Sequence, residues 1–198
     1  MISTFPTWNN QGVIPPIPAD PKLATNLPRS PYVVSLAEVI QRFSTTPTRI
    51  TILRGFLEYR AALHSAGLTQ GFQWLDGSFL ENKEAMTGQD PGDIDVATFF
   101  YLPLGVTQAE LFARDTLVFG PDRVARKQRF KVDAFLIPLE APIEIPVEDL
   151  VWNAHYWYGV FSHSRRRFLW KGFLQVDLSS AEDALAATTL APAGGVTP

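Results

Sequence analysis

The sequence contains no cysteine, which excludes disulfides, thiolate metal sites and a cysteine nucleophile. It also lacks an excess of positive charge: the formal net charge is −3 at pH 7, so we do not expect a protein that coats nucleic acid. No apolar run reaches the roughly 18 residues that a membrane helix needs. The N-terminus has neither a basic start nor a continuous apolar core, so it is not expected to be a signal peptide. These absences together favour a cytoplasmic protein.

Apolar material is plentiful, with 46% hydrophobic and 19% charged residues in a chain of 198. This composition predicts a folded core, and the length suits one domain with appendages. Residues 1–32 are rich in proline, which fixes φ and removes a backbone donor, so we expect an extended arm there. Residues 33–178 are expected to form the domain. Residues 179–198 are small and low in complexity, and we expect them to be a disordered tail.

Helix and strand patterns alternate between these two ends. Capping boxes, in which Ser or Thr is followed three residues later by Glu, predict helix starts at Ser35 and Thr107, and the second of these helices is expected to end at Gly120. Further helices are expected from Pro47 to Gly67 and over residues 147–161. Apolar runs predict strands at residues 71–75, 94–102, 129–139 and 172–178. This order predicts an α+β fold, with a small mixed β-sheet, helices packed mainly on one face and a Pro-rich N-terminal arm.

Three aspartates stand at the start of, or within, predicted strands, where a carboxylate is costly to bury unless something neutralises it. Asp93 and Asp95 are two residues apart and therefore point to the same side of a strand. Asp133 interrupts the apolar run of the third predicted strand. If that strand neighbours the second, the three carboxylates converge, and a cation must relieve their repulsion. Oxygen ligands without His or Cys suit Mg²⁺ or Mn²⁺. The plainer alternative for the first two is turn chemistry in "DPGD".

Gly77 and Ser78 follow the first predicted strand, where a glycine lets the backbone approach a phosphate and a hydroxyl adds a donor. A Gly-Ser pair alone is also typical of a plain turn. The informative pattern is the order of strand, Gly-Ser, loop, Asp-x-Asp strand, and an aspartate on a third strand. This order resembles the nucleotidyltransferase superfamily that includes DNA polymerase β and the minimal nucleotidyltransferases. More narrowly, "WLDGSF" and "PGDIDV" resemble a bacterial nucleotidyltransferase-like family, in which "RSPYVVS" and "FSHSRRRFLWKGFLQV" have counterparts.

The resemblance implies a nucleoside triphosphate such as ATP held by Gly77 and Ser78 through Mg²⁺ or Mn²⁺. It implies that Asp93 and Asp95 bind the metal ions, and that Asp133 binds the second ion and helps to deprotonate the acceptor hydroxyl. This sequence departs from the family pattern at two places that affect how a triphosphate would be held. Asp76 occupies a position that is often apolar in the superfamily, and the spacer from Ser78 to Asp93 is long.

Two basic segments are candidates for phosphate or acceptor contact, although a solvated basic face explains each as well. The run from Arg123 to Lys131 precedes the third strand, and Lys131 shares strand parity with Asp133, so we expect it to bind nucleotide. The second segment runs from His163 to Lys171 and includes the three arginines at 165–167. The neighbouring aromatic residues Trp152, Tyr156 and Trp157 have helical spacing and are expected to be core.

The sequence leaves the acceptor open among RNA, protein and small molecules. The main functional prediction is transfer of NMP from an NTP to a hydroxyl by a metal-dependent nucleotidyltransferase. The alternative is a catalytically inactive nucleotidyltransferase-like module that binds a partner protein, as in toxin–antitoxin or phage-defence pairs. A glycosyltransferase that uses Asp-x-Asp is less favoured because no earlier nucleotide-binding half is evident, and a metal-dependent nuclease is less favoured still.

Overall fold

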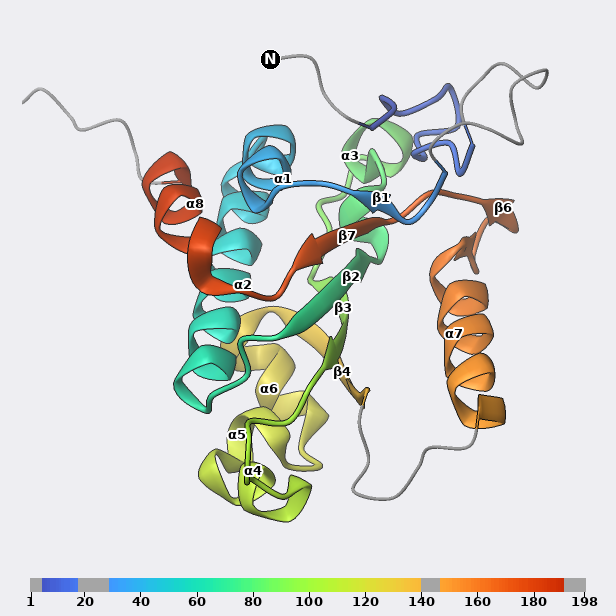
Figure 1. Cartoon of the computed structure of the whole chain (residues 1–198). Coiled ribbons are helices and arrows are strands. Elements are labelled where there is room, and N and C mark those ends of the chain that lie inside the picture. Colours follow the sequence, from blue (N-terminus) through green and yellow to red (C-terminus); the bar gives the residue numbers. More distant parts are fainter. Residues whose placement is uncertain (1–4, 18–28, 140–146, 191–198) are drawn as a thin grey trace, which may run out of the picture.

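A computed structural model describes residues 5–17, 29–139 and 147–190 of the chain. The described parts form an α+β domain around a five-stranded mixed sheet in the order β1-β7-β2-β3-β4 (Figure 1). The sheet strands are β1 (Tyr32–Val33), β2 (Gly71–Asp76), β3 (Ile94–Phe100), β4 (Val132–Pro138) and β7 (Leu174–Asp177). Pairings β1–β7 and β3–β4 are parallel, whereas β2 is antiparallel to both of its neighbours. The expectation of a small mixed sheet with helices is therefore correct.

Helices cover one face of the sheet more fully than the other, and α7 lies on the opposite side from α2 and α6 (Figure 1). The helices are α1 (Leu36–Phe43), α2 (Pro47–Ser65), α3 (Lys83–Thr87), α4 (Gln108–Arg114), α5 (Thr116–Phe119), α6 (Arg123–Phe130), α7 (Val147–Phe161) and α8 (Asp183–Leu190), with the 3₁₀ turns η2 (Ser78–Leu80) and η3 (Ser180–Glu182). A hairpin of β5 (His163–Ser164) and β6 (Leu169–Trp170) follows α7.

Both predicted capping boxes are present. The Ser35 hydroxyl accepts from the Glu38 amide and Thr107 accepts from that of Glu110, with each glutamate reaching back to its cap. The helix predicted to run on from Thr107 is instead divided into α4 and α5 at Asp115. The Asp115 carboxylate accepts from two backbone amides of the next turn, so it begins a second helix rather than continuing the first.

The N-terminal arm packs on the domain through Phe5, Val13 and Ile14, which are all buried. The Trp8 indole N–H donates to the Leu80 carbonyl at 2.6 Å. The remainder of the predicted 1–32 arm falls partly on residues 1–4 and 18–28, which lie outside the described residues. Its end, Tyr32, is already a sheet residue, because it pairs with Leu174 of β7.

The expected disorder of residues 179–198 is wrong for residues 180–190, which form η3 and α8. Asp183 bonds the fully buried guanidinium of Arg60, with Nη2 to Oδ1 at 2.7 Å. Ala186 and Leu190 are buried. A buried arginine needs a carboxylate partner, and that need orders this segment despite its bland composition. The rest of the predicted tail, residues 191–198, lies outside the described residues.

Candidate active site

Strand register brings three aspartates into line across the sheet. Asp76 of β2 lies opposite Asp95 of β3, and Asp95 lies opposite Asp133 of β4. Directly opposed residues point to the same face of a sheet, and here that is the face towards α7. Asp93 immediately precedes β3. One ligand oxygen each from Asp93, Asp95 and Asp133 can be chosen so that all lie within 4.8 Å of one another. The predicted convergence of these three carboxylates is therefore present.

Cationic side chains of α6 contact the same carboxylates. Arg123 donates to both oxygens of Asp133, from Nε at 2.5 Å and from Nη2 at 2.6 Å. The Lys127 ammonium pairs with Asp93 and lies 3.8 Å from Asp133 Oδ2. Both cations remain about half exposed, with 55% of the Arg123 side chain and 47% of the Lys127 side chain accessible. They are thus held at the mouth of the site.

Lys131 does not occupy the position that strand parity predicted. It is the C-cap of α6 with a left-handed backbone (φ 55°), and its side chain is exposed. The strand begins one residue later because Asp122 caps a helix over the basic run. Because the basic run is helical, residues four positions apart share a face. Arg123 and Lys127, rather than Lys131, therefore reach the carboxylates. The pair Pro121–Asp122 is the sequence signal that could have predicted this helix start, because aspartate is a preferred N-cap residue.

The Gly77–Ser78 turn lies beside the carboxylates at the end of β2. Gly77 has φ 86°, a conformation that other residues rarely adopt, and its α-carbon faces the Asp95 carboxylate without room for a side chain. Ser78, which is partly exposed, begins η2. The glycine is therefore needed both for the backbone conformation and for the close approach of the turn to Asp95.

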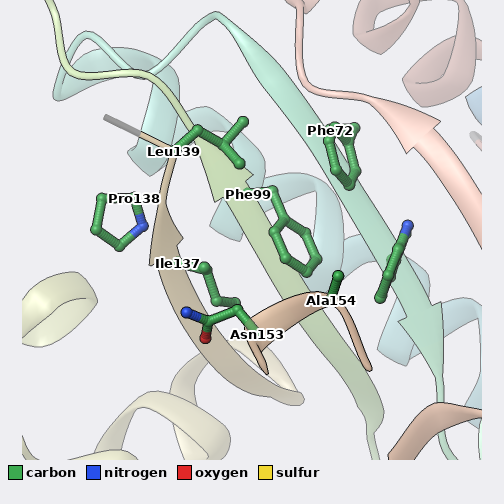
Figure 2. Close-up of a pocket in the computed structure, with 8 residues that line it drawn as sticks. Phe72, Phe99, Ile137, Pro138, Leu139, Asn153 and Ala154 are labelled. Carbon is green, nitrogen blue, oxygen red and sulfur yellow. The ribbon is translucent and has the colours of Figure 1, made fainter. Parts of the chain in front are cut away.

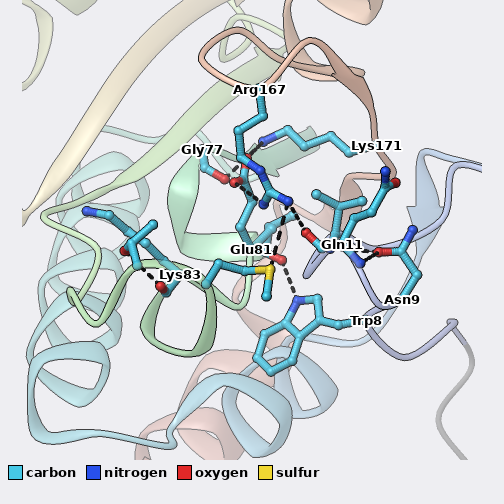
Figure 3. Close-up of polar contacts among 12 residues, drawn as sticks. Trp8, Asn9, Gln11, Gly77, Glu81, Lys83, Arg167 and Lys171 are labelled. Carbon is cyan, nitrogen blue, oxygen red and sulfur yellow. Dashed lines mark hydrogen bonds and ion pairs between the residues drawn. The ribbon is translucent and has the colours of Figure 1, made fainter.

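Buried polar contacts hold this turn from behind. Arg49 of α2 is fully buried and donates to the carbonyls of Phe79 and Glu81 at 2.6 and 2.7 Å. The Glu81 carboxylate lies 3.8 Å from the Arg167 guanidinium, which also donates to the Gln11 carbonyl of the N-terminal arm (Figure 3). Three segments far apart in sequence thus fix the position of the turn.

Lys171 ends the second basic segment, for which the sequence predicts a solvated face or acceptor contact, but the structure places it in the interior. Its side chain is only 3% exposed, and its ammonium lies 3.0 Å from the Gly77 carbonyl and 3.1 Å from Glu81 Oε1 (Figure 3). The same ammonium lies 3.0 Å from Asp76 Oδ1. This buried cation ties Asp76 to the Gly77 turn. Asp76, the departure from the family pattern, is accordingly one partner of an ion cluster that supports the turn.

Burial and like charge shape the ionisation of the site. Burial, followed by the charges of Asp93 and Asp133, raises the pKa of Asp95 to about 6. Burial raises the pKa of Asp76 to about 7, although Lys171 acts in the opposite direction. Asp76 shares the Lys171 ammonium with Glu81, so its charge is only partly compensated. A divalent cation at Asp93, Asp95 and Asp133 suits this oxygen-only donor set.

An apolar cavity of about 110 Å³ lies on the same sheet face, farther along the strands (Figure 2). Phe72, Phe99 and Ile137 contribute to it from the sheet, and Asn153 and Ala154 from α7. Phe99 and Ile137 each lie four residues beyond an aspartate of the site, a separation of about 13 Å along a strand. The face is thus polar at one end and apolar at the other.

The aromatic residues of α7 do not all belong to the core as expected. Trp157 packs on Phe135 with ring centroids 4.6 Å apart, whereas Trp152 and Tyr156 are exposed and stack on each other at 4.8 Å. Helical spacing alone could not separate the two groups, because Trp152 and Tyr156 lie one turn apart and Trp157 is adjacent. Their exposure depends on which side of α7 meets the sheet.

Fold and site define an α+β domain with a carboxylate cluster at one end of a mixed sheet. The chain belongs to a family described as a family of unknown function, DUF6932, whose model matches residues 6–177. Comparison with curated proteins and with solved structures gave no match. Within the described residues, no helix combines the length and apolar character that crossing a bilayer requires.

Proposed function

We propose that this protein is a metal-dependent nucleotidyltransferase that moves NMP from an NTP to a hydroxyl acceptor. The observation that carries the proposal is the convergence of Asp93, Asp95 and Asp133 within 4.8 Å on one sheet face. Buried or partly buried carboxylates this close repel one another, and a divalent cation relieves that repulsion. The adjacent Gly77–Ser78 turn supplies the close backbone approach that a phosphate needs.

Each of these residues has a defined part in the proposed reaction. Asp93 and Asp95 hold Mg²⁺ or Mn²⁺, which supplies charge neutralisation at the phosphates. Gly77 lets the triphosphate approach the backbone, and the Ser78 hydroxyl donates to a phosphate oxygen. The acceptor oxygen forms a bond to the α-phosphorus while the bond from that phosphorus to the bridging oxygen breaks. Pyrophosphate leaves, and the Asp133 carboxylate takes the hydroxyl proton.

Arg123 and Lys127 have two successive partners in this scheme. Without nucleotide they neutralise Asp133 and Asp93 through the contacts described above. Both side chains are about half exposed, so they can turn towards a bound triphosphate when the carboxylates take other partners. Arginine suits phosphate oxygens because its planar group donates in pairs. Asp133 is then free to accept a proton.

The same ion pairs support a second candidate, the catalytically inactive module that binds a partner protein. Asp133 already has both oxygens bonded by Arg123. If these pairs are permanent, α6 replaces the metal ion, and the carboxylates serve stability rather than chemistry. The two candidates differ in whether divalent metal and nucleotide bind at all.

A transfer experiment tests the proposal. The purified protein is incubated with each α-³²P-labelled NTP, with Mg²⁺ or Mn²⁺, in the presence of cell lysate. We expect label to appear on RNA, protein or a small molecule, and to be lost in Asp95→Asn. Glu58→Gln is the matched control, because it removes one exposed carboxylate that pairs with Arg129 away from the site.

Melting temperatures measured in parallel separate the candidates. An NTP with Mg²⁺ stabilises a protein that binds them in the folded state. Absence of both transfer and stabilisation, with any NTP and either metal ion, would refute the nucleotidyltransferase proposal and favour the inactive module.

A further inference from the structure

The β5–β6 hairpin presents a large apolar side chain where folding does not require one. Phe168 is 92% exposed and has a left-handed backbone with φ 54°. For a bulky residue this conformation is an outlier that costs energy. The exposed ring gains little from packing within the domain, so nothing there offsets this cost. Contact with a binding partner would explain why the residue is a phenylalanine.

The residues around Phe168 define the character of this surface. Trp170 of β6 is half exposed and lies opposite His163 of β5, which is also exposed. Arg165 and Arg166 in the turn are exposed. We call these five residues, 163, 165, 166, 168 and 170, the hairpin surface. It combines flat rings with two exposed arginines.

The hairpin is fixed beside the candidate active site. Arg167 does not contribute to the hairpin surface, because its guanidinium turns inward to the Gln11 carbonyl and to Glu81. Lys171 directly follows β6 and lies 3.0 Å from the Gly77 carbonyl. Phe168 lies three positions before Lys171, so the α-carbons of the two residues are at most roughly 11 Å apart, the reach of an extended chain.

We propose that the hairpin surface binds single-stranded nucleic acid and presents it as the acceptor strand. Unpaired bases expose flat faces that stack on Phe168 and Trp170, and the adjacent phosphates pair with Arg165 and Arg166. Assignment of the strand as acceptor rests on the proposed nucleotidyl transfer, whereas binding of the strand does not. A duplex fits poorly because its bases are already stacked on each other.

The acidity of the whole chain limits this binding to local contacts. The net charge is −3, so general attraction to a polyanion is absent. Two arginines release about two counterions, which predicts a slope of roughly −1.4 for log affinity against log salt concentration. Most of the affinity then comes from ring stacking, which is less sensitive to salt.

The test measures fluorescence anisotropy of labelled oligo(U) and oligo(dT) of about twelve nucleotides, with EDTA and no NTP. We expect binding to the single strands and weaker binding to a duplex of the same length. Phe168→Ala combined with Trp170→Ala should weaken binding by at least about tenfold, since each stacked base contributes roughly 1–3 kcal/mol. Leu104→Ala, at a fully exposed leucine elsewhere, is the control and should leave binding unchanged.

The outcomes distinguish this proposal from the proposed reaction. Strand binding without label transfer would leave the hairpin surface established and refute only the acceptor role. Failure to bind either oligonucleotide, or binding that the Phe168 and Trp170 substitutions do not affect, would overturn the proposal. If the protein binds no oligonucleotide, co-sedimentation with anionic vesicles is measured. Co-sedimentation of the wild type but not of Phe168→Ala would overturn the proposal and identify a lipid surface as the partner.

Discussion

The α-carbon of Gly77 faces the carboxylate of Asp95 so closely that a β-carbon at position 77 would lie 2.2 Å from Oδ2. Side-chain atoms do not tolerate such a contact. Either the carboxylate or the turn must move when any side chain is introduced. The geometry of the carboxylate cluster and that of the Gly-Ser turn are therefore linked through this one contact.

Gly77→Ala is expected to lower stability and to abolish stabilisation by Mg²⁺ and NTP. The Gly77 backbone, with φ 86° and ψ −171°, lies in a region that is essentially restricted to glycine and costs about 1–3 kcal/mol with a β-carbon, and the contact with Asp95 adds to that cost. Gly105→Ala is the matched control, because Gly105 has φ 75° with nothing within 4 Å of its β-carbon position. Denaturant unfolding measures both costs. Equal losses in the two variants, with the metal response retained, would contradict the linkage.

Asp95→Asn is expected to raise or preserve the melting temperature without metal, and to remove the increase that Mg²⁺ or Mn²⁺ produces. The substitution removes a charge that burial and two neighbouring carboxylates disfavour. Differential scanning fluorimetry with and without metal ion measures both effects, with Glu58→Gln as the control for charge alone. A clear loss of stability without metal would show that Asp95 is held by favourable contacts instead.

Stability should fall as the pH rises from about 4 to about 7, partly because of Asp76. Its pKa is about 7 in the folded protein and near 4 in an unfolded chain, so the folded state binds more protons between these values. The stabilising contribution is complete below the unfolded pKa and is lost as the pH approaches the folded one. Lys171 and Asp95 are the charged groups that act on Asp76, and the pKa of Asp95 is raised in the same direction.

Asp76→Asn should reduce this pH dependence. We expect the difference in unfolding free energy between pH 5 and pH 7.5 to shrink by at least about 1 kcal/mol, the equivalent of somewhat less than one pKa unit. Urea denaturation at the two pH values gives the measurement. Glu148→Gln, at an exposed residue of α7, is the control. The same pH dependence in Asp76→Asn and wild type would disprove the assignment.

Asp183→Ala is expected to destabilise the domain by about 2 kcal/mol, in the range for hydrogen bonds to a charged group. Arg60 is fully buried and would keep only its bonds to Gln73 and to two backbone carbonyls. Asp149→Ala, also in the first turn of a helix but exposed, should cost much less. Chemical denaturation compares the two. Equal stabilities would mean that the Arg60–Asp183 pair contributes little to the fold.

Local rules predicted much of the sheet and of the carboxylate cluster. Alternation placed Asp95 and Asp133 correctly because each follows the first residue of its strand, and the apolar residues around them settle which face they take. Capping boxes located two helix starts. These patterns involve residues that are close in sequence, so they can be recognised without knowledge of the tertiary structure.

Other features depend on contacts between distant segments. Lys131 was misplaced because a left-handed cap ends α6 only one residue before the strand. The role of Lys171 follows from its ion pairs with Asp76 and Glu81, which no local pattern encodes. The order in residues 180–190 depends in the same way on Arg60. Long-range electrostatic pairing thus accounts for Lys171 and for residues 180–190, whereas the error at Lys131 is a local one of helix length.

The parallel pairing of β3 with β4 has an evolutionary consequence. Asp95 and Asp133 are aligned by the pairing of residues 94–100 with residues 132–138. The connection between the strands, residues 101–131, takes no part in that pairing. Insertions and deletions in the loop at its start, residues 101–107, which contains no buried residue, can accumulate without separating the two carboxylates. A change of one residue inside either strand, by contrast, would turn an aspartate towards α2. Relatives should therefore vary in length between the strands while the strands themselves keep theirs.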